Sequence, residues 1–499
     1  MKRSVFKNFK KLSAGAAREP QAQAALPNRI SLGANGYRAA EWSPDRAYVY
    51  FPELDPRLEM TSYTHLQLLK KARWLYTNIG LARRIVNGLA GFVCGGGLRP
   101  IPDTSDISFN EEATRLFNAW AYTPGVFDVA GKFNFFTMQK KMYAHMLRDG
   151  DIFAVFAKAA SGAPQMAFYT ADKVGPYQCD KNTINGVYLN ARGRALWYNF
   201  YDKITGKAKQ LGARNVIHFG NFDSFGAARG TSAFVHAINN MLDITETQDY
   251  VKLGIKAASA VAYVVTTEGA RAAPASGLAA ALTEKVEVKD SEGKSYTVDQ
   301  FTGGGSIPQL PSGQDIKMIN DSRPHPNQQS FFDNLVRDIS WGVNISPDIL
   351  WNIEKAGGVG IRYAMSELQS FINDEQTRFK TSVLWRIYCY FIASKIEQGE
   401  LKPPKGGEWW RVNWLAPARQ TIDVGREGKT YSDMRSKNHI TDDEFCRIRG
   451  KDWRSEARQR ILEEKYKREL CAESGLSYAE VFGEKQNLTQ TLEVANSNE

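Results

Sequence analysis

Two acidic residues separated by one glycine are the first positions in this chain whose types and spacing suggest chemistry. Asp149 and Asp151 flank Gly150, after a helical pattern and before the apolar run 152–156. Neighbouring carboxylates can hold magnesium for hydrolysis of a phosphodiester. An Asp-Gly turn between a helix and a strand uses the same residues for backbone reasons, and we favour the turn. A metal-dependent DNA-processing enzyme, a nuclease using Asp149 and Asp151 with other acids, remains the alternative.

No other motif predicts a catalytic or cofactor site. The six histidines stand singly, and neither HExxH nor GxSxG is present. Residues 95–97 are three glycines without a following Lys-Ser or Lys-Thr, which indicates a tight turn. Gly293-Lys294-Ser295 resembles the end of a P-loop, but Val288 stands where that motif needs glycine. The five cysteines are far apart and form no CxxC pair. We therefore expect no enzyme, no cofactor and no metal.

Composition places the chain among ordinary globular proteins with a basic excess. Of 499 residues, 43% are hydrophobic and 24% charged, and the net charge is +10. This length allows two or three domains. No apolar run approaches the ~18 residues that span a bilayer, so we expect no membrane partner. The basic balance fits a surface that meets a polyanion, and it equally fits a solvated basic surface.

The element that organises the chain is a long helix followed by an excursion and a return helix. A strand at 216–219 leads through a turn to Thr231 and Ser232, which offer a hydroxyl N-cap to a helix running to about residue 260. A second helix covers 329–343. The roughly sixty residues between them are rich in Gly, Ala, Ser and Pro, with strand-like pieces at 286–289, 295–301 and 315–319. This layout favours a subunit of an elongated assembly over a catalytic domain.

Mixed helices and strands are expected on both sides of this pair. We predict helices at 61–91, 108–148, 363–396, 427–437, 442–449 and 454–470, and strands at 152–156, 165–170, 186–189, 195–201 and 409–415. Residues 12–35 and the last fifteen or so have the composition of flexible tails.

Several segments, taken in order, resemble the portal proteins of tailed bacteriophages, the lambda-type family. Before the long helix they are Leu69-Lys70-Lys71-Ala72-Arg73, Gly95-Gly96-Gly97-Leu98-Arg99-Pro100, Arg148-Asp149-Gly150-Asp151, Val216-Ile217-His218 and Arg229-Gly230-Thr231-Ser232. After the return helix they are Trp341-Gly342-Val343-Asn344-Ile345-Ser346-Pro347-Asp348-Ile349-Leu350 and Asn413-Trp414-Leu415-Ala416-Pro417 with Ile422-Asp423. Their order and spacing over residues 40–465 carry the resemblance, since no single motif is distinctive.

The resemblance implies an α+β portal-type fold with an α/β wing, a two-helix stem, a small clip insert and a helical C-terminal crown. The implied divisions are a basic tail at 1–40, the wing at 41–230 and 363–416, stem helices at 231–262 and 327–346, the clip at 263–326, the tunnel loop region at 347–362, the crown at 417–475 and a disordered tail at 476–499.

The same resemblance implies a function and partners. The chain would form a ring, usually a dodecamer, at one capsid vertex of the virion, through which double-stranded DNA is packaged and later ejected. Its partners would be the terminase large subunit, the major capsid protein and scaffold, and head-completion or connector proteins, with assembly in the host cytoplasm. A minor capsid component without a channel is a further alternative.

Candidate DNA-facing residues follow from what a sliding duplex requires. Weak contacts that repeat around a ring spread the electrostatic potential evenly along the channel wall. They attract phosphates and do not depend on the base sequence. Lys355 on the glycine-rich loop is the first candidate, with Arg362 behind it, followed by Lys252, Lys256 and Arg337 on the stem helices. An exposed lysine or an ion pair between subunits explains the stem residues as well. The stem also carries acids: Asp243, Glu246, Asp249, Asp333 and Asp338.

Overall fold

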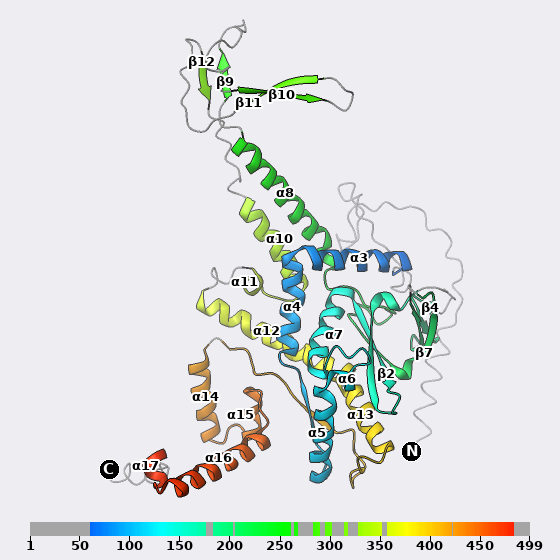
Figure 1. The fold of residues 1–499 in the computed structure, drawn as a ribbon, viewed down its shortest axis with the longest axis vertical. Coiled ribbons are helices and arrows are strands. Elements are labelled where there is room, and N and C mark those ends of the chain that lie inside the picture. The colour runs from blue at the N-terminus through cyan, green and yellow to red at the C-terminus, as the bar shows by residue number, and fades with distance from the viewer. Residues whose placement is uncertain are drawn as a thin grey trace, which may run out of the picture. The chain divides into compact units, whose positions relative to one another are not determined.

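The computed structural model describes residues 60–175, 183–202, 205–260, 264–267, 283–289, 295–301, 314–317, 328–351, 357–421 and 423–483. These residues all belong to one compact unit, 55–499. The predicted flexible tail at 12–35, Lys355 and the predicted tail beyond 483 lie outside the described residues. Figure 1 shows the order of the elements along the chain.

A group of packed helices forms the first part of the body. They are α3 (Ser62–Asn78), α4 (Gly80–Cys94), α5 (Ile107–Tyr122), α6 (Pro124–Phe127) and α7 (Phe135–Asp149). The range predicted as helical at 61–91 is broken at Ile79, whose backbone is extended, and the range at 108–148 is broken before α7. Thr61, Asp106 and Asn134 cap α3, α5 and α7 with their side chains.

Two antiparallel sheets pack beside these helices. The first contains β2 (Asp151–Lys158), β3 (Pro164–Thr170) and β8 (Val216–Gly220) in the order β3-β2-β8. The second contains β4 (Thr183–Ile184), β5 (Val187–Leu189), β6 (Ala195–Tyr201) and β7 (Ala208–Gly212) in chain order. Phe153 of β2 contacts Tyr198 and Phe200 of β6, with ring centroids 5.5 and 6.0 Å apart. The predicted strands at 152–156 and 216–219 are confirmed.

A long helical segment crosses the body and joins the helices to the sheet. It consists of α12 (Gly358–Phe379), a π-helical turn (Lys380–Leu384) and α13 (Trp385–Glu397). Gln376 donates to the Val93 carbonyl at the end of α4 at 2.9 Å, and Arg378 donates to the Gly220 carbonyl of β8 at 3.0 Å. Further on, β13 (Val412–Leu415) pairs with β1 (Arg99–Pro102). The strand predicted at 409–415 occupies only its last four residues.

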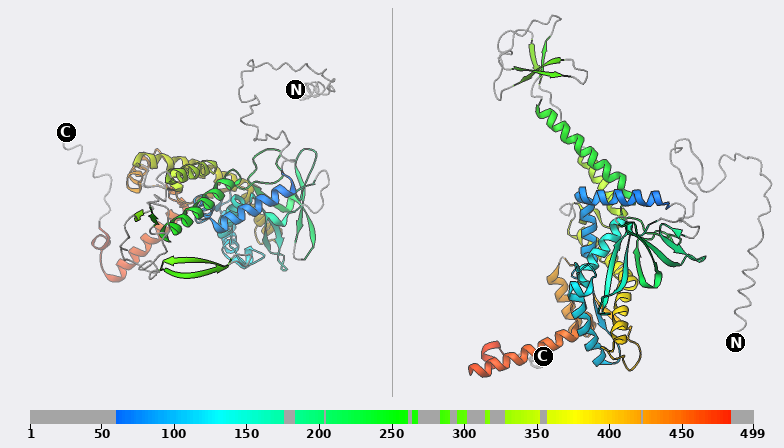
Figure 2. Two further views of the ribbon diagram at one scale, coloured as in Figure 1. Left: turned by 90° about the horizontal axis from the view of Figure 1, so that it is seen from above. Right: turned by 45° about the vertical axis from the view of Figure 1, so that its right-hand side comes forward.

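The predicted helix pair is present. The first helix is α8 (Ile238–Ala260) and the second is α10 (Gln328–Gly342), and they lie side by side in Figures 1 and 2. Asn240 donates to Asp338 at 2.7 Å across the pair. Four strands fall between the helices in sequence: β9 (Val264–Thr267) pairs with β12 (Gln314–Lys317), and β10 (Thr283–Lys289) with β11 (Ser295–Phe301). The helix α11 (Pro347–Leu350) follows α10.

The predicted start of the first helix is wrong by about one and a half turns. Thr231 and Ser232 do not cap α8, which begins at Ile238 after a 3₁₀ turn at Val235–Ala237. Their hydroxyls attach the chain to the body instead. Thr231 donates its side-chain hydrogen bond to Asp223, and Ser232 Oγ donates to the Leu147 carbonyl at 3.3 Å. Ser232 Oγ also accepts from the Phe234 N–H at 3.2 Å, just before the 3₁₀ turn.

The C-terminal part consists of helices. They are α14 (Val424–Ser436), α15 (Asp442–Ile448), α16 (Trp453–Ser474) and α17 (Tyr478–Phe482). α17 falls within the range 476–499 that was predicted to be disordered. Ser477 and Glu480 form a reciprocal capping box at its start, which a composition-based prediction of disorder does not detect.

Candidate functional site

Asp149, one of the two flagged carboxylates, lies at the end of α7 between two arginines. Arg73 of α3 donates to it from Nε and Nη2 at 3.1 and 2.8 Å, and Arg148 donates at 2.6 and 2.9 Å. Burial alone would raise the pKa of Asp149, but hydrogen bonds from the arginines and His145 hold that pKa below its usual range. Arg73 also donates to Asp172 at 2.6 Å. A charged network therefore joins the end of α7 to α3.

Asp151, the other carboxylate, is fully buried at the start of β2 and pairs with Arg229. Arg229 donates to its two oxygens from Nε at 2.6 Å and from Nη2 at 3.0 Å. Burial opposes ionisation of Asp151, yet the charge and hydrogen bonds of Arg229 hold its pKa below the usual range. The remaining donors of Arg229 reach the backbone carbonyls of Ala171, Val174 and Asn185 at 2.7–2.9 Å. All five guanidinium N–H groups are thus used.

Gly150 lets the chain turn between the two carboxylates and lets another segment cross it closely. Its φ is +93°, and it caps the C-terminal end of α7. A Cβ on Gly230 would lie 2.1 Å from the Gly150 carbonyl oxygen. The Gly230 N–H donates to Asp151 at 3.2 Å. As predicted, the Asp-Gly-Asp sequence is a turn, and its acids bind arginines from two other segments.

This arrangement does not suit metal-dependent hydrolysis. In Asp149 and in Asp151, both carboxylate oxygens accept hydrogen bonds from arginines. The two acids therefore do not face a common cation position. Within the described part of the chain, no group of three or more His, Cys, Asp or Glu side chains is placed to hold a metal ion. The two residues on which the hypothesis of a magnesium-dependent nuclease was based are therefore not placed to bind the metal.

The histidines pack or join these networks. His218 Nε2 lies 3.2 Å from Asp151, and His145 Nδ1 lies 3.5 Å from Asp149. Nε2 of His65 is buried without a hydrogen-bond partner, and burial lowers the pKa of His65 to about 4. His236 Nε2 lies 3.3 Å from the Ile339 carbonyl, where the 3₁₀ turn before α8 meets α10. The contacts of His145, His218 and His236 are thus with groups of the fold itself.

The predicted DNA-facing cations occupy three separate places on the surface. Lys252 on α8 pairs with Asp249 at 3.0 Å, and Lys256 on the next turn is exposed. Arg337 is exposed on α10. Arg362 on α12 lies 3.5 Å from Asp423 and keeps 55% of its side chain exposed. The structure therefore groups Lys252 with Lys256 and places the others on different helices, while Lys355 lies outside the described residues.

Two neighbouring sides of α8 carry different exposed residues. At about 100° of rotation per residue, Lys252 and Lys256 fall close to Asp249. The side roughly 120° further round the helix carries Asp243, Glu246, Tyr250 and Leu253, which recur every three or four residues and are all exposed. Tyr250 and Leu253 keep 66% and 63% of their surface exposed. One helix therefore presents a lysine-bearing face and an acidic, partly apolar face.

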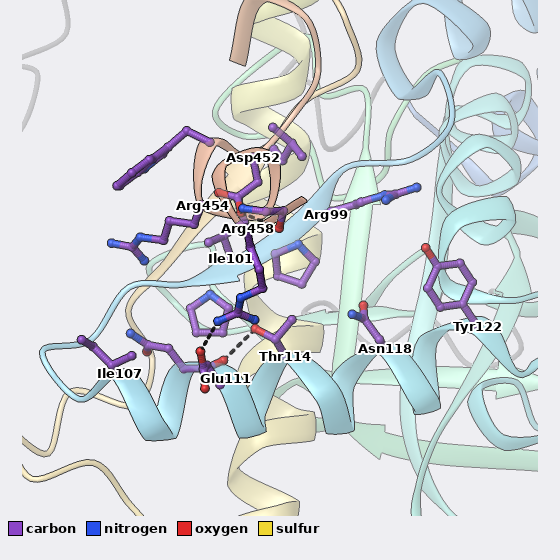
Figure 3. A pocket seen from close by; sticks show the side chains of 16 residues that line it. Arg99, Ile101, Ile107, Glu111, Thr114, Asn118, Tyr122, Asp452, Arg454 and Arg458 are labelled. Carbon is purple, nitrogen blue, oxygen red and sulfur yellow. Dashed lines mark hydrogen bonds and ion pairs between the residues drawn. The ribbon is translucent and has the colours of Figure 1, made fainter. Parts of the chain in front are cut away.

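A groove of ≈ 620 Å³ lies between α5, β1 and the start of α16 (Figure 3). Thr114, Asn118 and Tyr122 rise from α5 on the side facing β1, whose Arg99 lies nearby. Arg458 of α16 donates to Glu111 of α5 at 2.7 Å across the groove. The lining contains no histidine or cysteine. Its chemistry fits packing between the body and the C-terminal helices better than catalysis.

Sequence reasoning missed the Arg229–Asp151 pair, which joins residues 78 positions apart, so no local pattern reveals it. The positive charge of the first helices is visible in the sequence, because residues 62–94 contain five basic residues and no acidic one. The structure adds that Lys70, Lys71, Arg83 and Arg84 on α3 and α4 are exposed.

None of the described helices combines the length and apolarity needed to cross a membrane. A comparison with curated proteins gives no match. Solved structures do match in fold. The neck of a native gene transfer agent (GTA) particle, computed with C12 symmetry, contains a chain with a TM-score of 0.51 and 11% identity, covering 78% of this chain and 94% of that one. The neck of an empty GTA particle, computed with C6 symmetry, gives a TM-score of 0.51 and 11% identity, with 78% and 93% covered.

The sequence itself matches a protein family over residues 55–354, a stretch that includes the Asp149–Asp151 turn, Arg229 and both helices of the pair. The family is described as phage portal protein, lambda family. Because the match spans more than half of the chain, and the fold agrees, this chain belongs to the lambda family of phage portal proteins.

Proposed function

We propose that this portal protein acts as one subunit of a ring, with twelve copies as the expected number, whose channel conducts double-stranded DNA into and out of a capsid. The observation that carries the proposal is the helix pair α8 and α10. One end of each helix packs in the core, through Ile238, Met241 and Ile244 of α8 and Val336 and Ile339 of α10. Both helices also present charged, exposed residues. The C12 symmetry of the GTA neck structure supports twelve subunits.

In this scheme the parts of the chain have separate tasks. The helices and sheets of 41–230 and 363–416 are the wing, α8 and α10 with their flanks at 231–262 and 327–346 are the stem, and 263–326 is the clip. The range 347–362 is the tunnel loop region, and 417–475 is the crown. The clip docks the terminase large subunit and later the connector proteins, while the wing meets the major capsid protein and scaffold.

The channel holds DNA weakly, because a duplex that must slide cannot be bound by many strong, directional contacts. Lys252, Lys256 and Arg337 supply repeated charges along the stem, and Lys355 and Arg362 supply them near the tunnel loop. Each charge that approaches a phosphate adds a salt-dependent attraction that is independent of base sequence. Acids nearby, such as Asp249 beside Lys252, moderate this attraction and favour sliding.

The subunit itself performs no catalysis in this proposal. Energy for packaging comes from the terminase, which is a separate protein, and the protein's place is the portal vertex of the virion after assembly in the host cytoplasm. Asp149 and Asp151, the residues on which a nuclease would depend, serve the fold through their arginine pairs.

Electron microscopy of the purified full chain tests the ring directly. We expect closed rings with a central opening, and capsids assembled with them should package DNA when terminase and ATP are added. A preparation that stays monomeric under a range of assembly conditions would refute the proposal. A magnesium-dependent DNA cleavage assay separates the alternative: activity that Asp151→Asn abolishes, without unfolding the chain, would favour a nuclease.

A further inference from the structure

Two consecutive helices of the protein carry basic residues and no acidic one. α3 and α4 contain Lys70, Lys71, Arg73, Arg83 and Arg84. Arg73 is committed to Asp149 and Asp172. The other four are exposed, no ion pair joins them to a described residue within 4.0 Å, and we call them the α3–α4 basic patch. Arg83 lies over the Tyr76 ring, on another side of α3 from Lys70 and Lys71.

The part of the basic patch with Lys70 and Lys71 also has an aromatic residue. Trp74 lies one helical turn from both lysines and keeps 49% of its surface exposed. Tryptophan is enriched among the central residues of protein interfaces, and charged residues are typical of the surrounding rim. A surface that contacts only solvent does not require an exposed tryptophan.

A second surface has the opposite charge. The acidic stripe of α8 consists of Asp243, Glu246, Tyr250 and Leu253, which share one face of the helix. Tyr250 donates to Glu246 at 3.3 Å, which leaves its ring along the stripe. The salt bridge between Lys252 and Asp249 lies on the neighbouring side of α8. The stripe therefore carries negative charge together with exposed apolar area, as the basic patch carries positive charge together with Trp74.

The two surfaces meet two requirements of a head-to-tail contact: they are complementary in charge, and they lie at a similar level of the subunit. A cyclic ring joins two different, complementary surfaces of each subunit, and both must lie at a similar level along the ring axis. α3 packs against α8 in the same chain, and Figure 1 shows α3 beside the first turns of α8, where Asp243 and Glu246 are found. Among the described residues, no ion pair joins the two surfaces.

We propose that the α3–α4 basic patch of one subunit docks on the acidic α8 stripe of the neighbouring subunit, with Trp74 packed against Tyr250 and Leu253. This contact rests on the ring of the proposed function and identifies the surfaces that close it. A second copy explains both surfaces at once. DNA bound to the basic patch would leave the acidic stripe and its apolar residues uncovered.

Charge reversal provides the test, because one reversed surface should meet its own sign in the neighbour. D243K/E246K and K70E/K71E are purified separately as full chains and checked for native fold by circular dichroism and thermal melting. We expect each alone to need at least about tenfold more protein than the wild type to form rings, measured by mass photometry. An equal mixture should recover rings of alternating subunits, because each reversed surface then meets its opposite.

Wild-type assembly should weaken between about 0.1 and about 0.5 M NaCl.

The matched control is K252E/K256E, which changes two charges on the neighbouring side of α8 and should assemble like the wild type. The proposal is overturned if the two charge-reversal variants form rings as readily as the wild type, or if they fail alone and their mixture fails too. Intact K70E/K71E rings with reduced DNA packaging would instead assign the basic patch to DNA. A wild-type chain that forms no rings would refute the ring itself, which is a separate result.

Discussion

At the scale of single residues, the buried pair of Arg229 and Asp151 contributes to the stability of the folded chain, because each charge compensates the burial of the other. Replacing Asp151 with asparagine leaves Arg229 charged and buried, with two of its donors facing a neutral amide. Breaking a buried pair by removing one partner costs about 3–5 kcal/mol. We expect Asp151→Asn to lower the free energy of unfolding by this amount, measured by urea denaturation of the monomer.

The matched control is an exposed pair of similar length. Arg115 donates to Glu112 at 2.6 Å on the surface of α5. Because exposed ion pairs contribute about 0–1 kcal/mol, Glu112→Gln should change stability little. Equal losses for the two variants would show that burial of Asp151 does not set the strength of its pair.

His65 makes stability depend on mildly acidic pH. Burial lowers its pKa from 6.5 to about 4 in the folded protein. The unfolded chain therefore binds the proton first as pH falls, so this contribution to stability is present above pH 6.5 and is lost between 6.5 and about 4. We expect His65→Phe to flatten the dependence of the melting temperature on pH over this range. A wild type and variant whose melting temperatures fall in parallel would contradict the assignment.

At the scale of the elements, the glycine triplet after α4 is a turn in which only some of the glycines are required. Gly97 has φ +98°, and a Cβ there would lie 2.8 Å from the Phe136 ring. Gly96 has nothing within 4 Å of such an atom. We expect Gly97→Ala to cost about 2 kcal/mol or more through backbone strain and crowding of Phe136. Gly96→Ala should stay within about 0.5 kcal/mol of the wild type, and the reverse order in thermal unfolding would reject this account of the turn.

Elements with a strong local signal were predictable from the sequence. The strand β8 was predicted because its apolar, branched residues are bounded by turn residues, and the helices α8 and α10 because their apolar positions recur with helical spacing. The start of α8 was not predictable, since Thr231 and Ser232 look like a cap in sequence but bond to Asp223 and Leu147 of the body. Tertiary contacts decided which partner each hydroxyl takes.

The candidate site shows the same division between local and distant signals. The Asp149-Gly150-Asp151 turn was predicted from adjacent residues. Its arginine partners were not, because Arg73 and Arg229 lie 76 and 78 residues away. The candidate channel cations were chosen by charge on predicted helices, and a single chain does not assign them to DNA. Their role depends on neighbours that only an assembled ring supplies.

At the scale of the whole molecule, the two faces of α8 allow two tasks on one rod. An acidic, apolar face suits a contact between subunits, while Lys252 and Lys256 suit a wall that attracts DNA. Arg337 adds a cation from α10, and its helix is held beside α8 by the Asn240–Asp338 hydrogen bond. A helix pair divided in this way can close a ring with one side and guide a polyanion with the other.

The division predicts that removing the lysine charges affects DNA but not assembly. Lys252→Gln with Lys256→Gln removes two positive charges per subunit, and Lys355→Ala removes the loop charge, while the proposed subunit contact is unchanged. We expect rings in wild-type yield and a reduction of severalfold in the DNA retained by packaged capsids, measured by nuclease protection. The reduction should diminish at high salt, where phosphate contacts contribute less.

Asp249→Asn is the matched control, since it frees Lys252 from its ion pair and should retain DNA at least as well as the wild type. Lysine variants that fail to form rings would place these residues in the subunit contact rather than at the channel.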